Sequence, residues 1–470
     1  MKSIAISIDK VKQSTRMDGS YHNADINVYD DILQEHSSHC LDFYCSSIYT
    51  TGRGRRVYTR PDHGVPFLSN SDMTTQDPLM SCNYMSRKYG YDELSLLKGG
   101  MILTGRVGAI GQTAFVPKYW EKHSMMGSDN IIRIVVNEQY KNGFIYAYLA
   151  SKYGNLSFWK HATGGVQPFI TDKMVAELPI PDMSVAFQQE VDDLIQGSAR
   201  LREEAADMLE KSKNLLKEKA GLDNLVSEDY DYYGHRSADR KVSCFSIKQK
   251  EITTTTINAF NYSRRILNTK SKIQSTVPLK EVLLYNDVFS TGSFPRVEVS
   301  GNNGIMLINQ SDIFDAIIKG KRISKRRVKT DNLVEYGEVL IAGVGTLGDS
   351  EKFCHVIFAN EDLVGQLVSG EFIRMKTTKE VTSGYLFAWL DTDYGFRLIR
   401  NTQAGTKLCR PIPRMLLEIP VPLIDSDSMQ EIDRLVREAH TKRYQANCNE
   451  RKAISMVEKE IESWTTSKKN

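Results

Sequence analysis

One stretch of this chain occurs twice, 241 residues apart, and this internal repeat limits the possible folds more than any other feature. The first copy begins near Phe144 and reads FIYAYLASKYG, then ATGGVQPFITDKMVAELPIPD, then a long charged segment. The second begins near Tyr385 and reads YLFAWLDTDYG, then TQAGTKLCRPIPRMLLEIPVPL, then another long charged segment. Solenoid and propeller repeats are much shorter, at roughly 20–50 residues. The sequence therefore predicts one domain-plus-helix unit used twice.

The repeat extends upstream, where short apolar runs alternate with polar turns. GVPFLSNSDM at 64–73 matches GIMLINQSDI at 304–313, and 84–112 matches 322–350 with small shifts in the offset. The runs at 101–103 and 339–341 are apolar and flanked by glycine, which is typical of buried strands. IYAYLASKYG and LFAWLDTDYG have helical spacing and end in glycine, so we expect a helix that stops at Gly154 and Gly395. The proline-flanked runs at 179–181 and 420–422 should be extended.

Two long helices are predicted, at about 187–220 and 428–464. Each carries a narrow apolar seam at heptad spacing, which must meet a partner, and the economical partner is the other helix. The alternative is a solvated helix packed on its own domain. The seam residues are Val191, Leu194, Leu201, Met208 and Leu215, then Ile432, Leu435, Ile454, Val457 and Ile461.

These patterns together predict a mixed α/β (α+β) fold with two repeated domains. The predicted divisions are a first domain at 1–186, a first long helix at 187–221, a linker and second domain at 222–427, and a second long helix at 428–470. The first fifty residues are polar and look irregular.

Composition sets broad limits on location and chemistry. No run of about 18 apolar residues occurs, so we expect no membrane span, and the N-terminus lacks the apolar core of a signal peptide. Seven scattered cysteines without a secretion signal indicate reduced thiols and a cytoplasmic protein. A net charge of +3 neither favours nor excludes nucleic acid, so the clustering of charge matters more.

Basic residues gather in two places that could follow a phosphate backbone. The first is TGRGRRVYTRP at 51–61, and the second is an acid-free run of eleven residues at 319–329. Arginine can also bind guanine in the major groove with two hydrogen bonds. The candidate DNA-binding residues, including smaller candidates in glycine turns and closing loops, are Arg53, Arg55, Arg56, Arg60, Arg106, Lys160, Lys321, Arg322, Lys325, Arg326, Arg327, Lys407 and Arg410.

Patterns of catalysis are absent or weak. His36, His39, Cys40 and Cys45 match no familiar metal-ligand spacing, and we interpret them as ordinary polar and half-buried side chains. Gly343-x-Gly345-x-x-Gly348 fits a dinucleotide motif by letter, but the sequence after it looks like a strand, so we predict a glycine turn. We find no phosphate-binding lysine motif, no methyltransferase motif and no nucleophile elbow. The chain is therefore not expected to be an enzyme or to bind a cofactor or metal.

The combination of GMILTGRVGAIGQ, IYAYLASKYG, LPIPD and Phe187-Gln188-Gln189, repeated as YGEVLIAGVGTLGD, LFAWLDTDYG, EIPVPL and Met429-Gln430, resembles the specificity subunit of type I restriction–modification systems. The second copy departs from the pattern by having Leu408-Cys409 where the first has Gln167-Pro168. The resemblance implies that each domain reads one half of a split site in double-stranded DNA. It also implies that the two long helices pair antiparallel, set the spacing of the half-sites, and dock two methyltransferase subunits.

The same resemblance implies that cofactors belong to partner chains. Adenine methylation would use S-adenosylmethionine held by the methyltransferase subunits, and ATP and Mg²⁺ would act in motor-nuclease subunits that join for phage defence. Two alternatives stay open from sequence. One is the DNA-reading subunit of a different methyltransferase-linked defence system, and the other is an adaptor whose two domains bind proteins.

Overall fold

A computed structural model of the chain describes residues 5–19, 21–22, 24–225, 246–301, 304–348 and 351–467. The chain divides into two compact units, which we call unit 1 (Met1–Glu203 with Gln445–Asn470) and unit 2 (Glu204–Tyr444). Each unit therefore contains half of each long helix. Most of the expected linker, 226–245, lies outside the described residues.

Unit 1 contains two sheets built from short strands. The first has the order β2–β9–β6–β7 with antiparallel neighbours, and the second has the order β3–β5–β4–β8 with a parallel β4–β8 pair. A short pair, β1–β10, joins the start of the domain to its proline-flanked end. The strands are β1 (His39–Cys40), β2 (Cys45–Tyr49), β3 (Tyr58–Thr59), β4 (Gly64–Leu68), β5 (Asn83–Ser86), β6 (Ile102–Gly105), β7 (Thr113–Phe115), β8 (Met126–Gly127), β9 (Ile131–Val136) and β10 (Pro179–Ile180).

Unit 2 repeats this topology. The orders β15–β14–β17 and β13–β12–β16 correspond to β7–β6–β9 and β5–β4–β8, and β11–β20 corresponds to β1–β10. The predicted strands at 339–341 and 420–422 are confirmed. The strands are β11 (Thr276–Pro278), β12 (Gly304–Ile308), β13 (Lys321–Ser324), β14 (Val339–Ala342), β15 (Val356–Phe358), β16 (Leu367–Val368), β17 (Phe372–Met375), β18 (Gln403–Ala404), β19 (Arg410–Pro411) and β20 (Pro420–Pro422).

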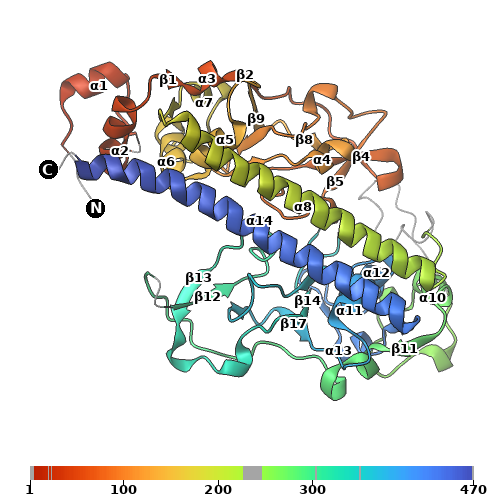
Figure 1. Cartoon of the computed structure of the whole chain (residues 1–470). Helices are drawn as coiled ribbons and strands as arrows, with labels where there is room; N and C mark the ends of the chain where they lie inside the picture. The colour runs from red at the N-terminus through yellow and green to blue at the C-terminus, as the bar shows by residue number, and fades with distance from the viewer. Residues whose placement is uncertain are drawn as a thin grey trace. The chain divides into compact units, whose positions relative to one another are not determined.

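Short helices pack on the sheets of each unit, and the two long helices, α8 and α14, follow the two domains in the chain (Figure 1). The mixed α/β class predicted from the sequence is confirmed. The long helices begin two residues before the predicted starts. The helices are α1 (Ile8–Ser14), α2 (Ala24–Glu35), α3 (Leu41–Tyr44), α4 (Lys118–Lys122), α5 (Asn142–Ala150), α6 (Lys152–His161), α7 (Asp172–Ala176), α8 (Val185–Lys219), α10 (Arg264–Ser271), α11 (Ser383–Leu390), α12 (Asp393–Asn401), α13 (Pro413–Leu416) and α14 (Ser426–Ser467).

Two local predictions were wrong. The first fifty residues are not irregular, because α1, α2 and β2 lie there. Gly154 does not end a helix either: α5 ends at Ala150, and Gly154 lies in the first turn of α6, where its N–H donates to the Ser151 hydroxyl. Gly395 has the same place in α12. A Cβ on Gly154 would lie 2.3 Å from the Tyr148 carbonyl oxygen, so glycine permits the tight corner between the helices.

Each domain is fastened to its long helix by the same contact. The Asp192 carboxylate of α8 accepts a hydrogen bond from the Gly143 N–H at 2.7 Å, at the start of α5. In unit 2, Asp433 of α14 accepts from the Gly384 N–H at 2.8 Å, at the start of α11. An anion at a helix N-terminus also interacts favourably with the helix dipole. The repeat therefore extends to how each domain meets its helix.

The buried face of each long helix has a strict heptad spacing. On α8 it consists of Val191, Ile195, Ser198, Arg202, Ala205, Leu209, Ser212 and Leu216, of which only Arg202 is not fully buried. The residues 241 positions later on α14 are Ile432, Val436, Ala439, Arg443, Ala446, Glu450, Ala453 and Val457. Small residues recur at every seventh position, which lets two helices approach closely.

The predicted seam coincides with the buried face in one column and lies one residue before it in the other. Val191 is buried, but Leu194, Leu201, Met208 and Leu215 are only half-buried, and the deeper column lies one residue later. Leu194 packs on the core of unit 1, while Met208 and Leu215 pack on that of unit 2. The apolar face is wider than a two-column seam because the helix contacts both its partner helix and a domain. On α14, Ile432, Leu435, Val457 and Ile461 are buried and Ile454 is half-buried.

Within unit 1 the two half-helices are joined by a buried polar cluster. Arg202 of α8 forms an ion pair with Glu450 of α14 at 2.5 Å and donates to the Asn447 side chain at 2.9 Å. The Tyr146 hydroxyl donates to the other Glu450 oxygen at 2.6 Å. Nearby, the Ser198 hydroxyl donates to the Ala446 carbonyl at 2.9 Å, so α8 and α14 lie side by side (Figure 1).

In unit 2 the corresponding half-helices are also in contact, since Lys442 of α14 pairs with Glu204 of α8 at 2.6 Å.

The described residues include no helix that is both long enough and apolar enough to cross a membrane.

Candidate nucleic-acid interface

Four loops of unit 1 are tied together by hydrogen bonds at one end of the sheets. The Asn70 side chain, after β4, donates to the Val107 carbonyl at 2.7 Å, in the glycine turn after β6. In that turn, the Arg106 N–H donates to the Asn130 carbonyl at 2.8 Å, and the Ile170 N–H donates to the Arg106 carbonyl at 2.9 Å. We call this cluster loop end 1. It consists of residues 69–72, 105–111, 128–130 and 163–169.

Unit 2 builds the same cluster from different side chains. The Gln310 amide exchanges two hydrogen bonds with the Val344 backbone, at 2.5 and 3.1 Å, where unit 1 has the single bond from Asn70. Gly345 and Cys409 exchange both backbone hydrogen bonds, at 3.2 and 2.7 Å. We call this cluster loop end 2, and it consists of residues 309–312, 343–348, 369–371 and 404–410.

We call the last loop of each cluster, at 163–169 or 404–410, its closing loop, and this loop turns at a glycine in the left-handed region. Gly164 has φ 100° and Gly405 has φ 109°, and a Cβ on either would press against a carbonyl oxygen across the loop. The turn leaves Val166 fully exposed and Leu408 mostly exposed. Exposed apolar and basic tips on a fixed stem are typical of a recognition loop.

Each unit has a buried arginine that donates to loop carbonyls, beside loop end 1 in unit 1 and at residues 332–333 in unit 2. Arg133 of β9 donates to the carbonyls of Ser128 and Ile131 at 3.1 and 2.7 Å, and also to that of Gly127. Burial lowers the pKa of Arg133 to about 10. Its counterpart Arg374 pairs with Glu338 through two nitrogen atoms, at 2.8 and 2.9 Å, and both side chains are fully buried. Both arginines hold the backbone of neighbouring loops.

The basic segment at 51–57 crosses the second sheet of unit 1. Arg53, Arg55 and Arg56 are exposed, but Arg56 forms an ion pair with Asp129, in loop end 1. The hydrogen bond to Asp129 raises the pKa of Arg56. Arg60 is half-buried before β4. This segment therefore carries three exposed guanidinium groups, and the ion pair with Asp129 places that of Arg56 beside loop end 1.

The other candidate cations lie in several places. Arg106 lies half-buried in loop end 1, and Lys407 and Arg410 are exposed in loop end 2. The basic run at 319–329 is spread along β13. Lys321 lies opposite Leu307, close to loop end 2, and pairs with Glu298, whereas Lys325 and Arg326 follow the opposite end of the strand.

Arg322 is exposed and donates to the Gly304 carbonyl at 3.2 Å. The Arg327 side chain lies outside the described residues. DNA contact by this run stays a prediction.

Lys160, which the sequence predicted as a DNA-binding candidate, is buried. Its side chain is 6% exposed and forms an ion pair with Asp30 of α2, and its ammonium group lies over the Tyr21 ring. The reason is that Lys160 lies on the inner face of α6, which packs on α2. A buried ammonium group with a carboxylate partner is not available to a phosphate, so we remove Lys160 from the interface.

The structure also explains the histidine cluster and the glycine motif. His36 stacks on Trp464 and His39 stacks on Phe43, with ring centroids 4.3 and 3.7 Å apart. Within the described part of the chain, no three potential metal ligands come together. The glycine motif at 343–348 leads into β15 rather than a helix, so the predicted glycine turn is confirmed.

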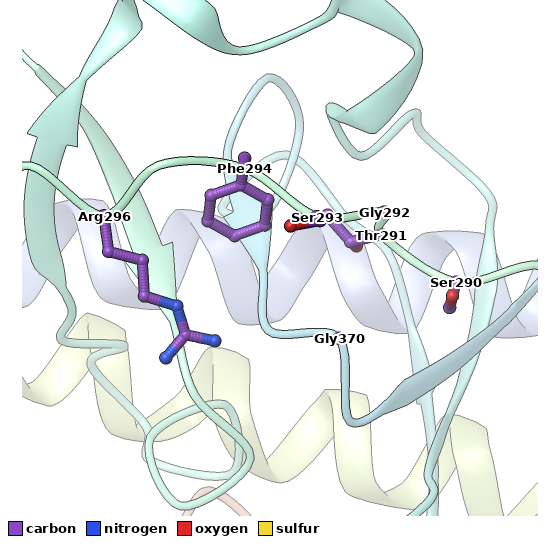
Figure 2. A pocket seen from close by; sticks show the side chains of 7 residues that line it. All are labelled: Ser290, Thr291, Gly292, Ser293, Phe294, Arg296 and Gly370. Atoms are coloured by element: carbon purple, nitrogen blue, oxygen red, sulfur yellow. The ribbon is translucent and has the colours of Figure 1, made fainter.

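Sequence reasoning missed one segment of unit 2. TGRGRRV at 51–57 matches TGSFPRV at 291–297, so Arg296 is the counterpart of Arg56. Figure 2 shows Phe294 and Arg296 on this segment beside a pocket that Gly370 also lines. The repeat offset of 240 was the signal that could have found it.

Comparison with known proteins gives solved structures only; no family model and no curated relative matches the chain. A type I restriction–modification S subunit from M. genitalium is 12% identical, with a TM-score of 0.31 over 91% of this chain and 92% of that one. The HsdS subunit from Thermoanaerobacter tengcongensis is 12% identical, with a TM-score of 0.25 over 89% and 94%. A structure described as showing complex assembly of the type I R-M system is 13% identical, with a TM-score of 0.27 over 90% and 96%.

The chain is similar to type I specificity subunits. At TM-scores this low, the superpositions carry no argument about function, which must come from the loops and helices of this chain.

Proposed function

We propose that this chain is a sequence-specific DNA-binding subunit, and that each loop end reads one half of a bipartite site in duplex DNA. The observation that carries the proposal is the repeated loop end: the same hydrogen-bonded stems hold loops whose exposed side chains differ between the units. A fixed scaffold with variable tips is the arrangement by which one fold reads different sequences.

The long helices supply the second part of the proposal. Each helix contributes one half to unit 1 and the other half to unit 2, so a change in helix length alters the distance between the two loop ends. We propose that the helix pair sets the spacing between half-sites and docks two methyltransferase subunits. S-adenosylmethionine would be held by those subunits, with ATP and Mg²⁺ in motor-nuclease subunits, and this chain would act in the cytoplasm without catalysis of its own.

The helix length gives a quantitative test. Insertion of seven residues between 203 and 204, together with seven between 444 and 445, adds two turns to both helices and keeps the heptad register. Two turns extend a helix by about 10.5 Å. At about 3.4 Å per base pair, the gap between the half-sites should grow by up to about three base pairs.

The measurement is selection of bound duplexes from a random-sequence pool, with and without a methyltransferase partner. A seven-residue insertion between Lys88 and Tyr89, in an exposed turn outside both loop ends, is the control and should leave the selected motif unchanged. A longer gap between unchanged half-sequences supports the proposal. Altered half-sequences would show that the helices do more than set spacing, and selection of no motif would favour a protein-binding adaptor.

A further inference from the structure

Among the described residues, Arg296 in the segment 291–297 of unit 2 has no carboxylate partner, unlike its counterpart Arg56 in unit 1. In both units the segment leaves the first sheet, crosses the second and joins its edge, with an arginine just before the edge residue. In unit 1 this arginine, Arg56, is neutralised by Asp129. The two units thus provide an internal comparison of the same site with and without a carboxylate.

Gly370 occupies the place of Asp129. β8 and β16 correspond at an offset of 241, so Ser128-Asp129-Asn130 corresponds to Ser369-Gly370-Glu371. Among the described residues, no carboxylate pairs with Arg296. The nearby Glu298 is engaged by Lys321 at 2.6 Å, and Glu371 does not line the space in front of Arg296.

An open pocket of about 330 Å³ takes the place of the missing ion pair. It is lined by Ser290, Thr291, Gly292, Ser293, Phe294, Arg296 and Gly370 (Figure 2). The Arg296 guanidinium lies over the Phe294 ring at 5.9 Å, which favours an extended arginine. The Thr291 hydroxyl already accepts from Arg374 at 3.2 Å, so the floor of the pocket is held by the buried Arg374–Glu338 pair.

The groups around the pocket suit an anion. Arg296 offers a guanidinium with several N–H donors, Ser290 and Ser293 offer exposed hydroxyls, and Gly370 presents no side chain. Arginine, serine and threonine are among the side chains that contact the phosphates of DNA. An ionised oxygen also forms the stronger, charge-assisted hydrogen bonds with a guanidinium. The pocket opens to solvent, so a phosphate that remains part of a polymer can enter it.

We propose that this pocket binds a phosphodiester group of the DNA backbone in unit 2, and that Asp129 closes the equivalent place in unit 1. The proposal rests on the proposed function, because it assigns one backbone contact within it. It predicts an asymmetry between the units. Arg296 binds a phosphate, whereas Arg56 binds one only if the Asp129 carboxylate is removed.

The test measures how DNA affinity depends on salt. The probe is a duplex selected by the wild-type full chain from a random-sequence pool, and binding is followed by fluorescence anisotropy between 50 and 200 mM salt. Each lost phosphate contact lowers the magnitude of the slope of log K against log salt by about 0.9. For Arg296→Gln, the fall in affinity across this fourfold salt range should therefore be about 3.5-fold smaller than for wild type.

Gly370 allows a matched pair of variants. A Cβ at Gly370 would meet only the Thr291 carbonyl oxygen, at an ordinary 3.4 Å, so a side chain fits there. Gly370→Asp should recreate the ion pair of unit 1 and reduce the slope as Arg296→Gln does. Gly370→Asn has nearly the same size without the charge, so it fills part of the pocket but forms no ion pair with Arg296, and it should reduce the slope less than Gly370→Asp does. In unit 1, Asp129→Asn should free Arg56 and raise the magnitude of the slope by about 0.9.

The outcomes separate this inference from the proposed function. If wild type selects a duplex but Arg296→Gln and Gly370→Asp keep its slope, the pocket binds no phosphate, while the DNA-reading function stands. If Gly370→Asn reduces the slope as much as Gly370→Asp, the side chain alone blocks the pocket, and the part of the inference that assigns the closure of unit 1 to the Asp129 charge is overturned. If wild type binds no duplex at any salt concentration, the proposed function fails first, and this inference fails with it.

Discussion

The buried cluster between the half-helices of unit 1 makes a sharp energetic prediction. The Arg202 side chain is 17% exposed and that of Glu450 is 6% exposed, so the ion pair is largely out of water. Burial opposes the charged form of Arg202, but the adjacent Glu450 carboxylate raises the pKa of Arg202 overall. We expect Glu450→Leu and Arg202→Leu each to lower the free energy of unfolding of this region, because each leaves one buried charge without its partner.

The magnitude follows from what each variant leaves behind. Removing one member of a buried pair costs about 3–5 kcal/mol. We expect about 3 kcal/mol for Glu450→Leu, since Arg202 keeps some exposure and its hydrogen bond to Asn447. The double variant buries two leucines instead of two charges, which is often neutral. It leaves the Tyr146 hydroxyl without its acceptor, at about 1–3 kcal/mol, and Tyr146→Phe should recover most of that loss.

The assay is hydrogen exchange of peptides from 185–203 and 445–461, which reports the opening free energy of these half-helices directly. Peptides from 204–219 are the internal control, because they belong to unit 2 and should keep wild-type exchange. The double variant should exchange more slowly than either single variant. If the double variant loses as much opening free energy as the two single variants together, the residues do not interact energetically and the reasoning is refuted.

Three further perturbations test other contacts. Gly384→Ala should destabilise unit 2 by about 1–3 kcal/mol in thermal unfolding, since its Cβ would lie 2.5 Å from an Asp433 carboxylate oxygen; an unchanged midpoint would argue against this contact. Burial holds the pKa of His440 well below its ordinary value, so the unfolded chain binds a proton that the folded chain does not. Stability should therefore fall as pH drops below about 6.5, by up to about 1.4 kcal/mol per pH unit, and His440→Leu should remove this contribution. Lys160→Met should lower the thermal midpoint and leave the salt slope of DNA binding unchanged. Arg410→Gln should leave the thermal midpoint unchanged and lower the magnitude of the salt slope.

The repeat was readable from sequence because the framework residues are fixed by packing and backbone geometry. Gly143 and Gly384 lie so close to an aspartate that a Cβ would clash with it, and the strands at 102–105 and 339–342 are buried in the core. Such positions tolerate few residue types, so the glycines are identical in both copies and the strands stay largely apolar. The fold class, the strands and the long helices followed from these positions.

The surface was less readable, because exposure depends on contacts distant in sequence. Lys160 looks like any lysine before a loop, and only the packing of α6 on α2 shows that Asp30 holds it. The second seam column is a similar case. Heptad spacing identified Val191 but could not choose between Leu194 and Ile195, since both are apolar and the choice depends on where the domain lies.

The closing loops lead to a prediction about the DNA site itself. Their stems are equivalent in backbone pairing, but the Val166 tip corresponds to Lys407, and Phe169 on the stem corresponds to Arg410. An apolar tip can contact a thymine methyl group, whereas lysine and arginine favour guanine or phosphate. If the loop ends read DNA, the two half-sites should be unrelated in sequence rather than inverted copies, and methylome sequencing of cells with and without this gene would reveal them. A palindromic motif would mean that these tips do not determine the sequence read, and that recognition lies in elements that the two units share.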